Sequence, residues 1–387
     1  MSLITLDSGP VGLFQGGGLS SLALGVWLAE NAVPTHHYIA DIGQSPRADI
    51  DELAQSLRQF GAPTTVIDAR ARMAEIAADL LRYQARHDGG YWNTTGSSRF
   101  VLVEQLAPQL LADGCQVLAH GCVGGGNDQR RFARHSQRLA PSLKVYAPWV
   151  DPDALRRFPD RETMLKAVNE RQLWLDPGSD ATRSTDANLA GSSHESADLE
   201  DLGTPVTALS PRWSRWATDA PTEAETVVIR FEQGRVVDVD GSGPEPLAWI
   251  TRCNEVGARH GIWLRDVVER RIIGTVCRGV YEAPGLELLD RAWSRVLQAS
   301  LDNQAHELYE RLSSVVGAAM YEARWLDPAA VAARTAIDVL LADVSAQVTL
   351  VAHRGAARVS SIEVASNVVR QTRFGSGGHR WSQVATG

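Results

Sequence analysis

Residues 11–27, VGLFQGGGLSSLALGVW, constrain the fold more than any other part of the chain. A short apolar run ends in three consecutive glycines, and an apolar pattern with helical spacing begins at Leu19. We therefore expect a strand, a tight loop and a helix N-terminus in direct succession. Such a loop suits a phosphate, because glycines let the backbone approach closely and the first N–H groups of a helix lack partners. The alternative is a strand-to-helix turn without a ligand, because the stretch contains neither G-x-G-x-x-G nor G-K-[ST].

Strands and helices alternate through the first part of the chain. Strands are expected at residues 37–42, 64–68, 116–120 and 144–147, and helices at 49–60, 71–85 and 100–112. This order predicts an α/β fold with a doubly wound parallel sheet, in which ligands bind beyond the carboxyl ends of the strands. The glycine loop lies at that edge. A polar and aromatic stretch at 88–99, DGGYWNTTGSSR, is predicted to be a loop that carries functional side chains.

The later part of the chain has a different pattern. Composition alone favours a solvated linker at 176–201, which is poor in large apolar residues. A hairpin ending in Asp-Gly starts at residue 226, followed by a helix at 247–260 and an extended segment at 272–281. Helices are expected at 286–309 and 329–344, with a second hairpin at 346–359. We expect an α+β arrangement with antiparallel strands.

Charge and cysteine usage narrow the classes of function. A net charge of −8 and a pI near 5.7 argue against a nucleic-acid binder, and no apolar run approaches a membrane span. The four cysteines are Cys115, Cys122, Cys253 and Cys277, and they form no C-x-x-C pattern. We expect reduced thiols in a cytoplasmic protein, with neither a disulfide framework nor a zinc site. The N-terminus has no signal-peptide pattern.

Several landmarks point to one family. Residues 119–132, AHGCVGGGNDQRRF, match A-H-G-C-T-G-K-G-N-D-Q-V-R-F, and residues 147–149 match A-P-W. Residues 40–44 fit A-D-L-G-Q, and residues 184–201 fit S-x-D-x-N-L-x-x-x-S-x-E-x-x-x-L-E-D. Further matches follow at 260–261, 268–269 and 278–285. In this order, over roughly residues 10 to 365, the chain resembles argininosuccinate synthetase, an AMP-forming ligase.

The resemblance implies an organisation and a reaction. It implies an adenine nucleotide hydrolase-like nucleotide-binding domain at 1–165, an acceptor-binding synthetase domain at 166–365 and a tail at 366–387. In that family ATP transfers AMP to the ureido oxygen of citrulline, and the amine of aspartate then displaces AMP. ATP and Mg²⁺ are the implied cofactors, and a citrulline-like acceptor and an amine are the implied partners. A homo-oligomer is also implied, although a short glycine-rich tail stands where the family has its helical assembly arm.

The acceptor positions of the family carry over well. A guanidinium, hydroxyls, an amide and a carboxylate are what a zwitterion with a ureido head requires. We expect Arg131 and Glu269 to anchor the amino-acid end, and Asn127, Asp128 and Arg131 to act in catalysis by positioning and charge stabilisation. The expected substrate-binding residues are Tyr91, Asn127, Asp128, Arg131, Ser184, Ser193, Glu269 and Tyr281. The chain departs from the family at Gly96, where a serine is expected, and at Val123, where a threonine would bind aspartate.

The nucleotide loop departs most. The family's S-G-G-L-D-T-S is replaced by GGGLSSL at residues 16–22, which removes two serines and an aspartate able to organise magnesium. The expected cofactor-binding residues are Gly16, Gly17, Gly18, Ser20, Ser21, Ala40 and Gly121. We predict a diverged ligase that joins citrulline or a ureido analogue to aspartate or another amine. The alternatives are a pseudoenzyme that binds citrulline or nucleotide as a sensor or regulator, and an enzyme that runs a reaction without ATP.

Overall fold

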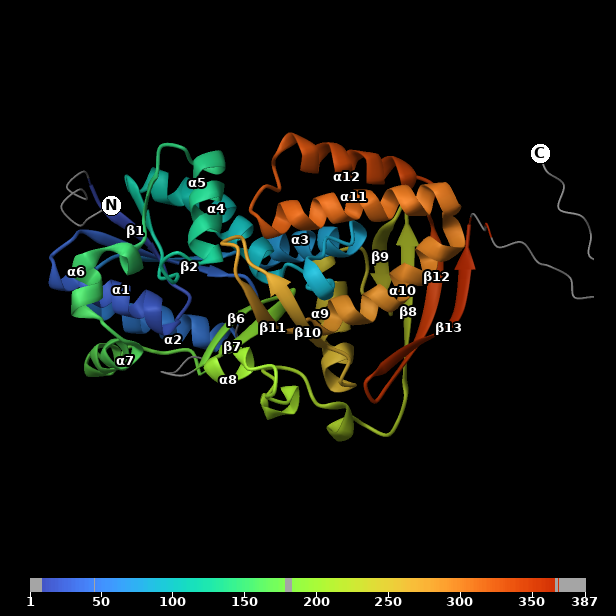
Figure 1. The fold of residues 1–387 in the computed structure, drawn as a ribbon, viewed down its shortest axis with the longest axis horizontal. Coiled ribbons are helices and arrows are strands. Elements are labelled where there is room, and N and C mark those ends of the chain that lie inside the picture. The colour runs from blue at the N-terminus through green and yellow to red at the C-terminus, as the bar shows by residue number, and fades with distance from the viewer. Residues whose placement is uncertain (1–8, 45, 178–182, 366–367, 369–387) are drawn as a thin grey trace, which may run out of the picture.

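A computed structural model of the chain describes residues 9–44, 46–177, 183–365 and 368 (Figure 1). A five-stranded parallel sheet in the order β3-β2-β1-β4-β5 forms its first part, which confirms the predicted α/β class and doubly wound sheet. Its strands are β1 (Val11–Phe14), β2 (Thr35–Asp41), β3 (Thr64–Asp68), β4 (Val117–Ala119) and β5 (Lys144–Tyr146). From β1 the chain winds outward through β2 to β3 and then returns to β4 on the other side of β1. The glycine loop therefore follows β1 at the switch point of the sheet, where open α/β sheets bind their ligands.

Helices cover both faces of this sheet. One face packs on α1 (Leu19–Glu30), α2 (Arg47–Leu57) and α7 (Arg161–Glu170), whose buried side chains share an apolar cluster with β1. The other face packs on α3 (Arg70–Arg82), α4 (Thr94–Ala112) and α5 (Asn127–Leu139). Val11 and Leu13 enter the first cluster and Phe14 the second, as the alternation of side chains along a strand requires. The short helix α6 (Pro152–Arg157) follows β5.

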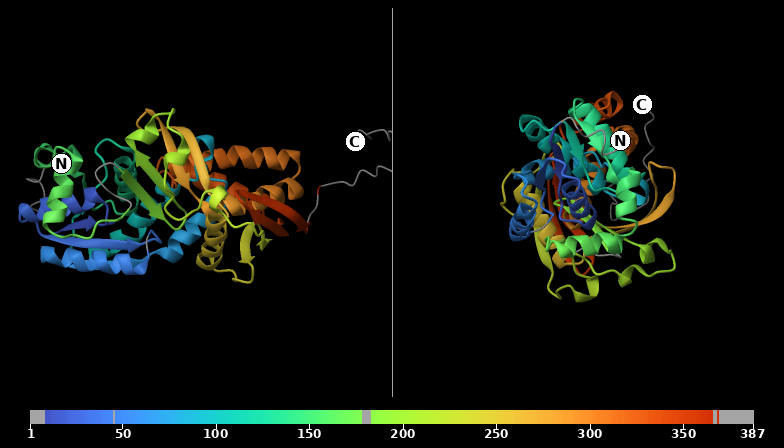
Figure 2. Two further views of the ribbon diagram at one scale, coloured as in Figure 1. Left: turned by 90° about the horizontal axis from the view of Figure 1, so that it is seen from below. Right: turned by 90° about the vertical axis from the view of Figure 1, so that its left-hand side faces the viewer.

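Two antiparallel sheets form the later part of the molecule. The sheet β10-β11-β7-β6 lies next to the parallel sheet, and the sheet β13-β12-β8-β9 lies at the far end (Figure 1; Figure 2, left). The strands are β6 (Arg183–Asn188), β7 (Gly191–Ser196), β8 (Glu225–Glu232), β9 (Arg235–Val239), β10 (Leu264–Arg270), β11 (Val276–Glu282), β12 (Ala346–His353) and β13 (Ala356–Val364). The helices are α8 (Ala197–Glu200), α9 (Pro246–Arg259), α10 (Pro284–Ser300), α11 (Asn303–Tyr321) and α12 (Pro328–Leu340). Within the described ranges, no helix is both long and apolar enough to cross a membrane.

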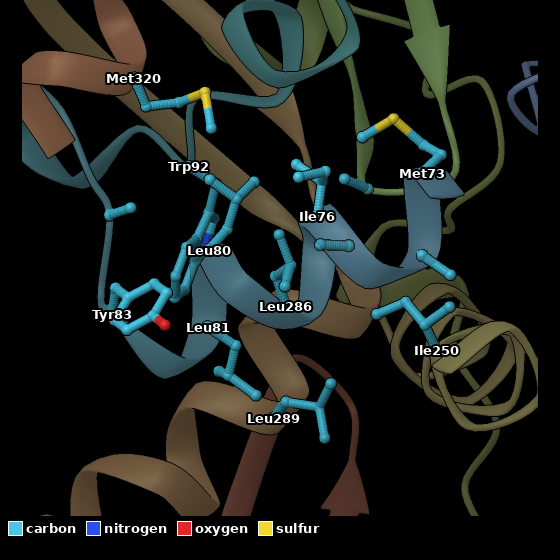
Figure 3. Close-up of a cluster of buried hydrophobic side chains, with 14 of the residues drawn as sticks. Met73, Ile76, Leu80, Leu81, Tyr83, Trp92, Ile250, Leu286, Leu289 and Met320 are labelled. Carbon is cyan, nitrogen blue, oxygen red and sulfur yellow. The ribbon is translucent and has the colours of Figure 1, made fainter. Parts of the chain in front are cut away.

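The largest apolar core joins the two parts of the chain. Met73, Ile76 and Leu80 of α3 lie against Ile250 of α9 and Leu286 of α10 (Figure 3). All of these side chains are buried. Close packing of this kind holds α3 and α4 at a fixed position relative to α9, α10 and α11. Side chains contributed by both parts can therefore form one rigid site.

The predicted loop at 88–99 is wrong in its second half. Residues 94–99 form the first turns of α4, and Asn93 precedes them with a φ of 57°. The hydroxyls of Ser97 and Ser98 donate to the carbonyls of Thr94 and Thr95 at 2.8 and 2.9 Å. These small polar side chains are buried inside the protein, so apolar spacing could not identify the helix.

Other expected elements need correction. The single helix expected at 286–309 is two helices, because Leu301 is extended and the Asp302 carboxylate caps α11 by accepting from Ala305 N at 2.9 Å. The region that composition assigned to a linker contains β6, β7 and α8. The extended segment expected at 272–281 starts as a turn and becomes β11, and its partner β10 had no prediction. The glycine-rich tail from Arg370 lies outside the described residues.

Candidate active site

A cavity of about 440 Å³ lies beyond the carboxyl ends of β1, β2 and β4 and reaches the sheet that contains β7, β10 and β11. It is bounded at one end by the glycine loop and at the other by aromatic side chains. Thirteen of the predicted site residues line it, although they are spread over more than 260 positions. They are Gly16, Gly18, Ser20, Ser21, Ala40, Tyr91, Gly121, Asn127, Asp128, Arg131, Ser193, Glu269 and Tyr281.

Two predicted residues are placed differently. Gly17 faces the core, where an added Cβ would lie 2.5 Å from the Trp174 ring, and its φ of +75° favours glycine. Ser184 lies in β6 and pairs with Glu195 of β7 through the backbone register. Its side chain is outside the described part of the structure.

The glycine loop leaves its backbone open toward the cavity. Gly18 is extended at the N-terminus of α1, and no side chain among the described residues caps this helix. The Ser21 hydroxyl is directed back into the loop, because it donates to the Gly18 carbonyl at 2.9 Å. An added Cβ on Gly16 would meet no atom within 4 Å, whereas one on Gly121 would lie 2.5 Å from Ser21 N. The loop therefore offers backbone N–H groups and free space, which suit an anion such as a phosphate.

The wall beside the loop is the end of β2. Ala40 is buried and lines the cavity. The Gln44 side chain donates to the Ala40 carbonyl at 2.9 Å and accepts from Ile42 N at 2.8 Å. This local bridge fixes the backbone that follows β2. A rigid main-chain wall next to a phosphate-sized space is compatible with a nucleotide.

Four charged side chains form a network in the middle of the cavity. The Arg99 guanidinium contacts Asp186 at 2.7 and 3.2 Å and Asp128 at 2.9 Å. Arg131 Nη1 contacts the other oxygen of Asp128 at 2.8 Å. Only 12% of the Arg99 side chain and 4% of the Arg131 side chain are exposed. Strong ion pairs of this kind fix the orientation of each member.

The two carboxyl groups of this network titrate differently. Burial raises the pKa of a carboxyl, but Asp128 lies between two guanidinium groups, which together bring its pKa below the ordinary range. Asp186 has only Arg99 beside it, and burial together with the charge of Asp128 raises its pKa. Asp128 therefore stays ionised to a lower pH than Asp186 does.

The aromatic end of the cavity contains two incompletely paired charges. Arg131 Nη2 and Glu269 Oε2 are buried, and neither has a hydrogen-bond partner among the described residues. Burial raises the pKa of Glu269, although the nearby Tyr281 and Tyr321 hydroxyls act in the opposite direction. The rings of Tyr91 and Tyr281 stack with their centroids 3.9 Å apart, and Tyr91 accepts a hydrogen bond from Thr95 N at 2.9 Å. A guanidinium nitrogen and a carboxylate oxygen that lack partners among the described residues, beside a rigid aromatic wall, can bind the two charges of an amino acid.

Asn127 is held by protein groups on both sides of its amide. Its Nδ2 donates to the Tyr321 hydroxyl at 2.9 Å, and its Oδ1 accepts from Ile272 N at 3.0 Å. Ile272 belongs to the turn between β10 and β11, so Asn127 ties this turn to α5. Each amide atom retains capacity for one further hydrogen bond, which leaves Asn127 able to contact a ligand.

Sequence reasoning missed two residues that shape the site. Arg99 lies one helical turn after Thr95, and it could have been found if α4 had been predicted to begin at residue 94. Tyr321 ends α11, and no motif in the sequence marks it as a site residue. Gly96 stands where a serine was expected from the resemblance. The structure leaves little room for a side chain there, because an added Cβ would lie 3.0 Å from the carbonyl oxygen of Met320. Val123 lies at the rim of the cavity with 70% of its surface exposed.

Side chains of His, Cys, Asp and Glu are the usual protein ligands of metal ions. Among those that the structure describes, no group of three or more His, Cys, Asp or Glu side chains is arranged to hold a metal ion. The altered glycine loop likewise carries no carboxylate between residues 16 and 22.

The chain matches two domains of one known protein family. Residues 11–166 match the family described as the arginosuccinate synthase N-terminal HUP domain. Residues 183–373 match the family described as the arginosuccinate synthase C-terminal domain. The two matches cover most of the chain and follow the order of the parallel sheet and the antiparallel sheets. The chain therefore belongs to the argininosuccinate synthase family of ATP-dependent ligases.

Proposed function

We propose that this protein is an AMP-forming C–N ligase that joins citrulline, or a close ureido analogue, to an amine. The observation that carries the proposal is a pair of buried atoms, Arg131 Nη2 and Glu269 Oε2, that have no partner among the described residues and lie in the same cavity as the open backbone of the glycine loop. The guanidinium matches an α-carboxylate and the carboxylate matches an α-ammonium. Ser193, Tyr91 and Tyr281 line the same end and offer hydroxyls for the ureido side chain.

The reaction requires two displacements. The ureido oxygen attacks the α-phosphorus of ATP, so that an O–P bond forms, the bond to pyrophosphate breaks and AMP becomes attached to the oxygen of the ureido carbon. The amine then attacks that carbon, which forms the C–N bond, breaks the C–O bond and releases AMP and a proton. Asn127, Asp128 and Arg131 serve by positioning and by stabilising charge.

The proposed amine is either aspartate or an amine that carries less negative charge. Val123 keeps the shape of the threonine expected there but cannot donate a hydrogen bond to a carboxylate. In a site that excludes water, loss of one hydrogen bond to a charged group costs about 1.5 to 3 kcal/mol, or roughly ten- to a hundredfold in affinity, and the cost is smaller where Val123 stays exposed to water. A less acidic amine avoids this cost.

ATP and Mg²⁺ are proposed as the co-substrate and its metal. Backbone N–H groups at Gly16, Gly18 and Gly121 would contact the phosphates, the side chains of Ser20 and Ser21 would adjoin them, and Ala40 would contact the base. ATP supplies the leaving group that a urea lacks, and Mg²⁺ neutralises phosphate charge. Because the loop lacks a carboxylate, Mg²⁺ would be held mainly through the phosphates and water.

The decisive experiment follows pyrophosphate release. The protein is incubated with ATP, Mg²⁺, citrulline and a panel of amines that includes aspartate, alanine, glycinamide and ornithine. Pyrophosphate and AMP formed in equal amounts, dependent on citrulline and on one of the amines, support the ligase. Citrulline binding by calorimetry without any nucleotide binding in the presence of Mg²⁺ would refute it.

One observation favours a second candidate, a pseudoenzyme that binds citrulline or nucleotide as a sensor or regulator. The Ser21 hydroxyl, one of two in the glycine loop, is used within the loop by its hydrogen bond to Gly18. The pyrophosphate would therefore depend almost wholly on backbone donors. Under this candidate the same calorimetry gives citrulline binding, and pyrophosphate release is absent with every amine.

A further inference from the structure

Tyr321 contacts three of the predicted acceptor residues, Asn127, Arg131 and Glu269, through its polar atoms. Its hydroxyl accepts from Asn127 Nδ2 at 2.9 Å and donates to Glu269 Oε1 at 3.2 Å. Its main-chain carbonyl accepts from Arg131 Nε at 2.9 Å, and the guanidinium of Arg131 lies 4.7 Å from its ring centroid. One residue of α11 therefore fixes the amide, the carboxylate and the cation that the proposed function assigns to the acceptor.

The ring of Tyr321 is held as firmly as its polar atoms. It stacks on His87 with the ring centroids 3.5 Å apart and meets the edge of Tyr91 at 6.4 Å. Only 2% of Tyr321 is exposed. The preceding residue, Met320, belongs to the buried cluster that also contains Trp92 (Figure 3). Trp92 follows Tyr91 and Met320 precedes Tyr321 in the chain. Because Trp92 and Met320 are packed in the core, they also hold the two tyrosines in place.

The polar contacts of Tyr321 have one consistent direction. A hydroxyl that accepts from an amide N–H keeps its own proton for the carboxylate, so the order Asn127, Tyr321, Glu269 forms a short donor chain. This chain satisfies Glu269 Oε1 and leaves Oε2 without a partner among the described residues. The remaining oxygen is then the one available to a ligand.

We propose that Tyr321 is a positioning residue of the acceptor site, which orients the Asn127 amide and the Glu269 carboxylate toward one bound amino acid. The inference rests on the proposed function, because it assumes that the acceptor end binds citrulline. Tyr321 acts through its neighbours and is not assigned a contact with the reacting atoms.

The test uses the substitution Tyr321→Phe in the full chain, with Tyr309→Phe as a matched control. Phenylalanine keeps the ring contacts with His87 and Arg131 and removes only the hydroxyl. Tyr309 lies in the same helix and is equally buried, and its hydroxyl donates to the Arg82 carbonyl at 2.7 Å, outside the lining of the cavity. We expect the citrulline Kd by calorimetry to rise roughly ten- to a hundredfold in Tyr321→Phe and by less than about twofold in Tyr309→Phe.

A double-mutant cycle separates positioning from general support of the fold. In a Glu269→Gln background the Tyr321→Phe substitution should weaken citrulline binding by only a fraction of its effect in the wild type, because its main partner has changed. Equal effects in both backgrounds overturn the inference. An unchanged Kd in Tyr321→Phe overturns it as well, while the proposed function survives. If the wild type itself does not bind citrulline, the proposed function fails and the inference fails with it.

The pH profile is a second readout that a structural role would not change. The titratable and charged groups facing Glu269 are His87, Tyr91, Arg131, Cys277, Tyr281 and Tyr321. Because the Tyr321 hydroxyl stabilises the ionised carboxylate, its removal should raise the pKa of Glu269. We expect the pH at which citrulline affinity declines to move upward in Tyr321→Phe and to stay in place in Tyr309→Phe. A superimposable profile in Tyr321→Phe overturns the inference.

Discussion

The two ends of the cavity are built from different groups. At the acceptor end, buried ionic side chains such as Arg131 and Glu269 face the space, and each is fixed by partners from several elements. At the glycine-loop end, the groups that face the space belong to Gly16, Gly18 and the N-terminus of α1. A backbone site keeps its geometry when side chains change, whereas a site of ionic side chains does not. A backbone loop can therefore keep its strand–loop–helix shape without the three side chains that the family pattern S-G-G-L-D-T-S would place in residues 16–22.

If the ionic side chains hold their end of the cavity together, a substitution in the network of Arg99, Asp128, Asp186 and Arg131 should have the largest effect on stability. Arg99→Met leaves Asp186 without its cation and Asp128 with one cation instead of two. We expect a loss of about 3 kcal/mol in the free energy of unfolding, at the lower end of the range for buried ion pairs because the carboxylates are partly exposed. Urea unfolding measures this change.

The matched control for this substitution is Arg311→Met. Arg311 pairs with Glu307 on the surface of α11, and the two side chains are 74% and 64% exposed. Such a pair contributes about 0 to 1 kcal/mol. Equal losses of stability in the two variants would mean that the network around Arg99 is no more important to the fold than a surface ion pair.

Some members of this network could be predicted from the sequence, and others could not. The order of strands and helices gave the parallel sheet, and the resemblance placed Arg131 and Glu269 at one ligand although 138 positions separate them. Arg99 was assigned to a loop, because the polar residues before it are buried in a helix and carry no apolar period. Tyr321 could not be predicted, since its role depends on where α11 ends in space.

The next prediction tests the ligand contact itself. Glu269→Gln keeps the size of the side chain but removes the charge that would pair with an α-ammonium. We expect citrulline to bind roughly ten- to a hundredfold more weakly, with ATP affinity unchanged, because the loop is at the other end of the cavity. Isothermal titration calorimetry measures both, and Glu307→Gln on the surface of α11 is the control. A parallel loss of ATP affinity would contradict the separation of the two ends.

The raised pKa of Glu269 predicts a pH dependence of binding with a definite sign. Burial raises this pKa above the ordinary value of 4.5, so the carboxylate becomes protonated at a higher pH than in the unfolded chain. As the pH falls through that raised value, Glu269 loses its charge and citrulline affinity should decline. The same shift means that the folded state holds this proton more tightly, so protonation of Glu269 does not destabilise the fold.

Titrations of citrulline from pH 8 to mildly acidic pH check this dependence, together with thermal unfolding at each pH. In Glu269→Gln the affinity should be lower and should no longer fall through the same range. A profile in Glu269→Gln that keeps the decline of the wild type would assign the titration to another group, such as Asp186.

The smallest expected effect is at the backbone end. An added side chain at Gly16 meets open space, so Gly16→Ser together with Ser20→Asp should be tolerated by the fold. The new hydroxyl adds one phosphate contact and the new carboxylate can organise Mg²⁺, at a net gain of about 0.5 to 1.5 kcal/mol, or roughly two- to tenfold in ATP affinity. Without Mg²⁺ the carboxylate should repel the phosphates, so the gain should disappear when EDTA is added to the calorimetry. Gly17→Ala is the contrast, because its φ of +75° and the Trp174 ring should cost about 1 to 2 kcal/mol of stability. If the double substitution leaves ATP affinity unchanged with and without Mg²⁺, the loop is not a phosphate site, and ligand binding in this cavity belongs to the end built from ionic side chains.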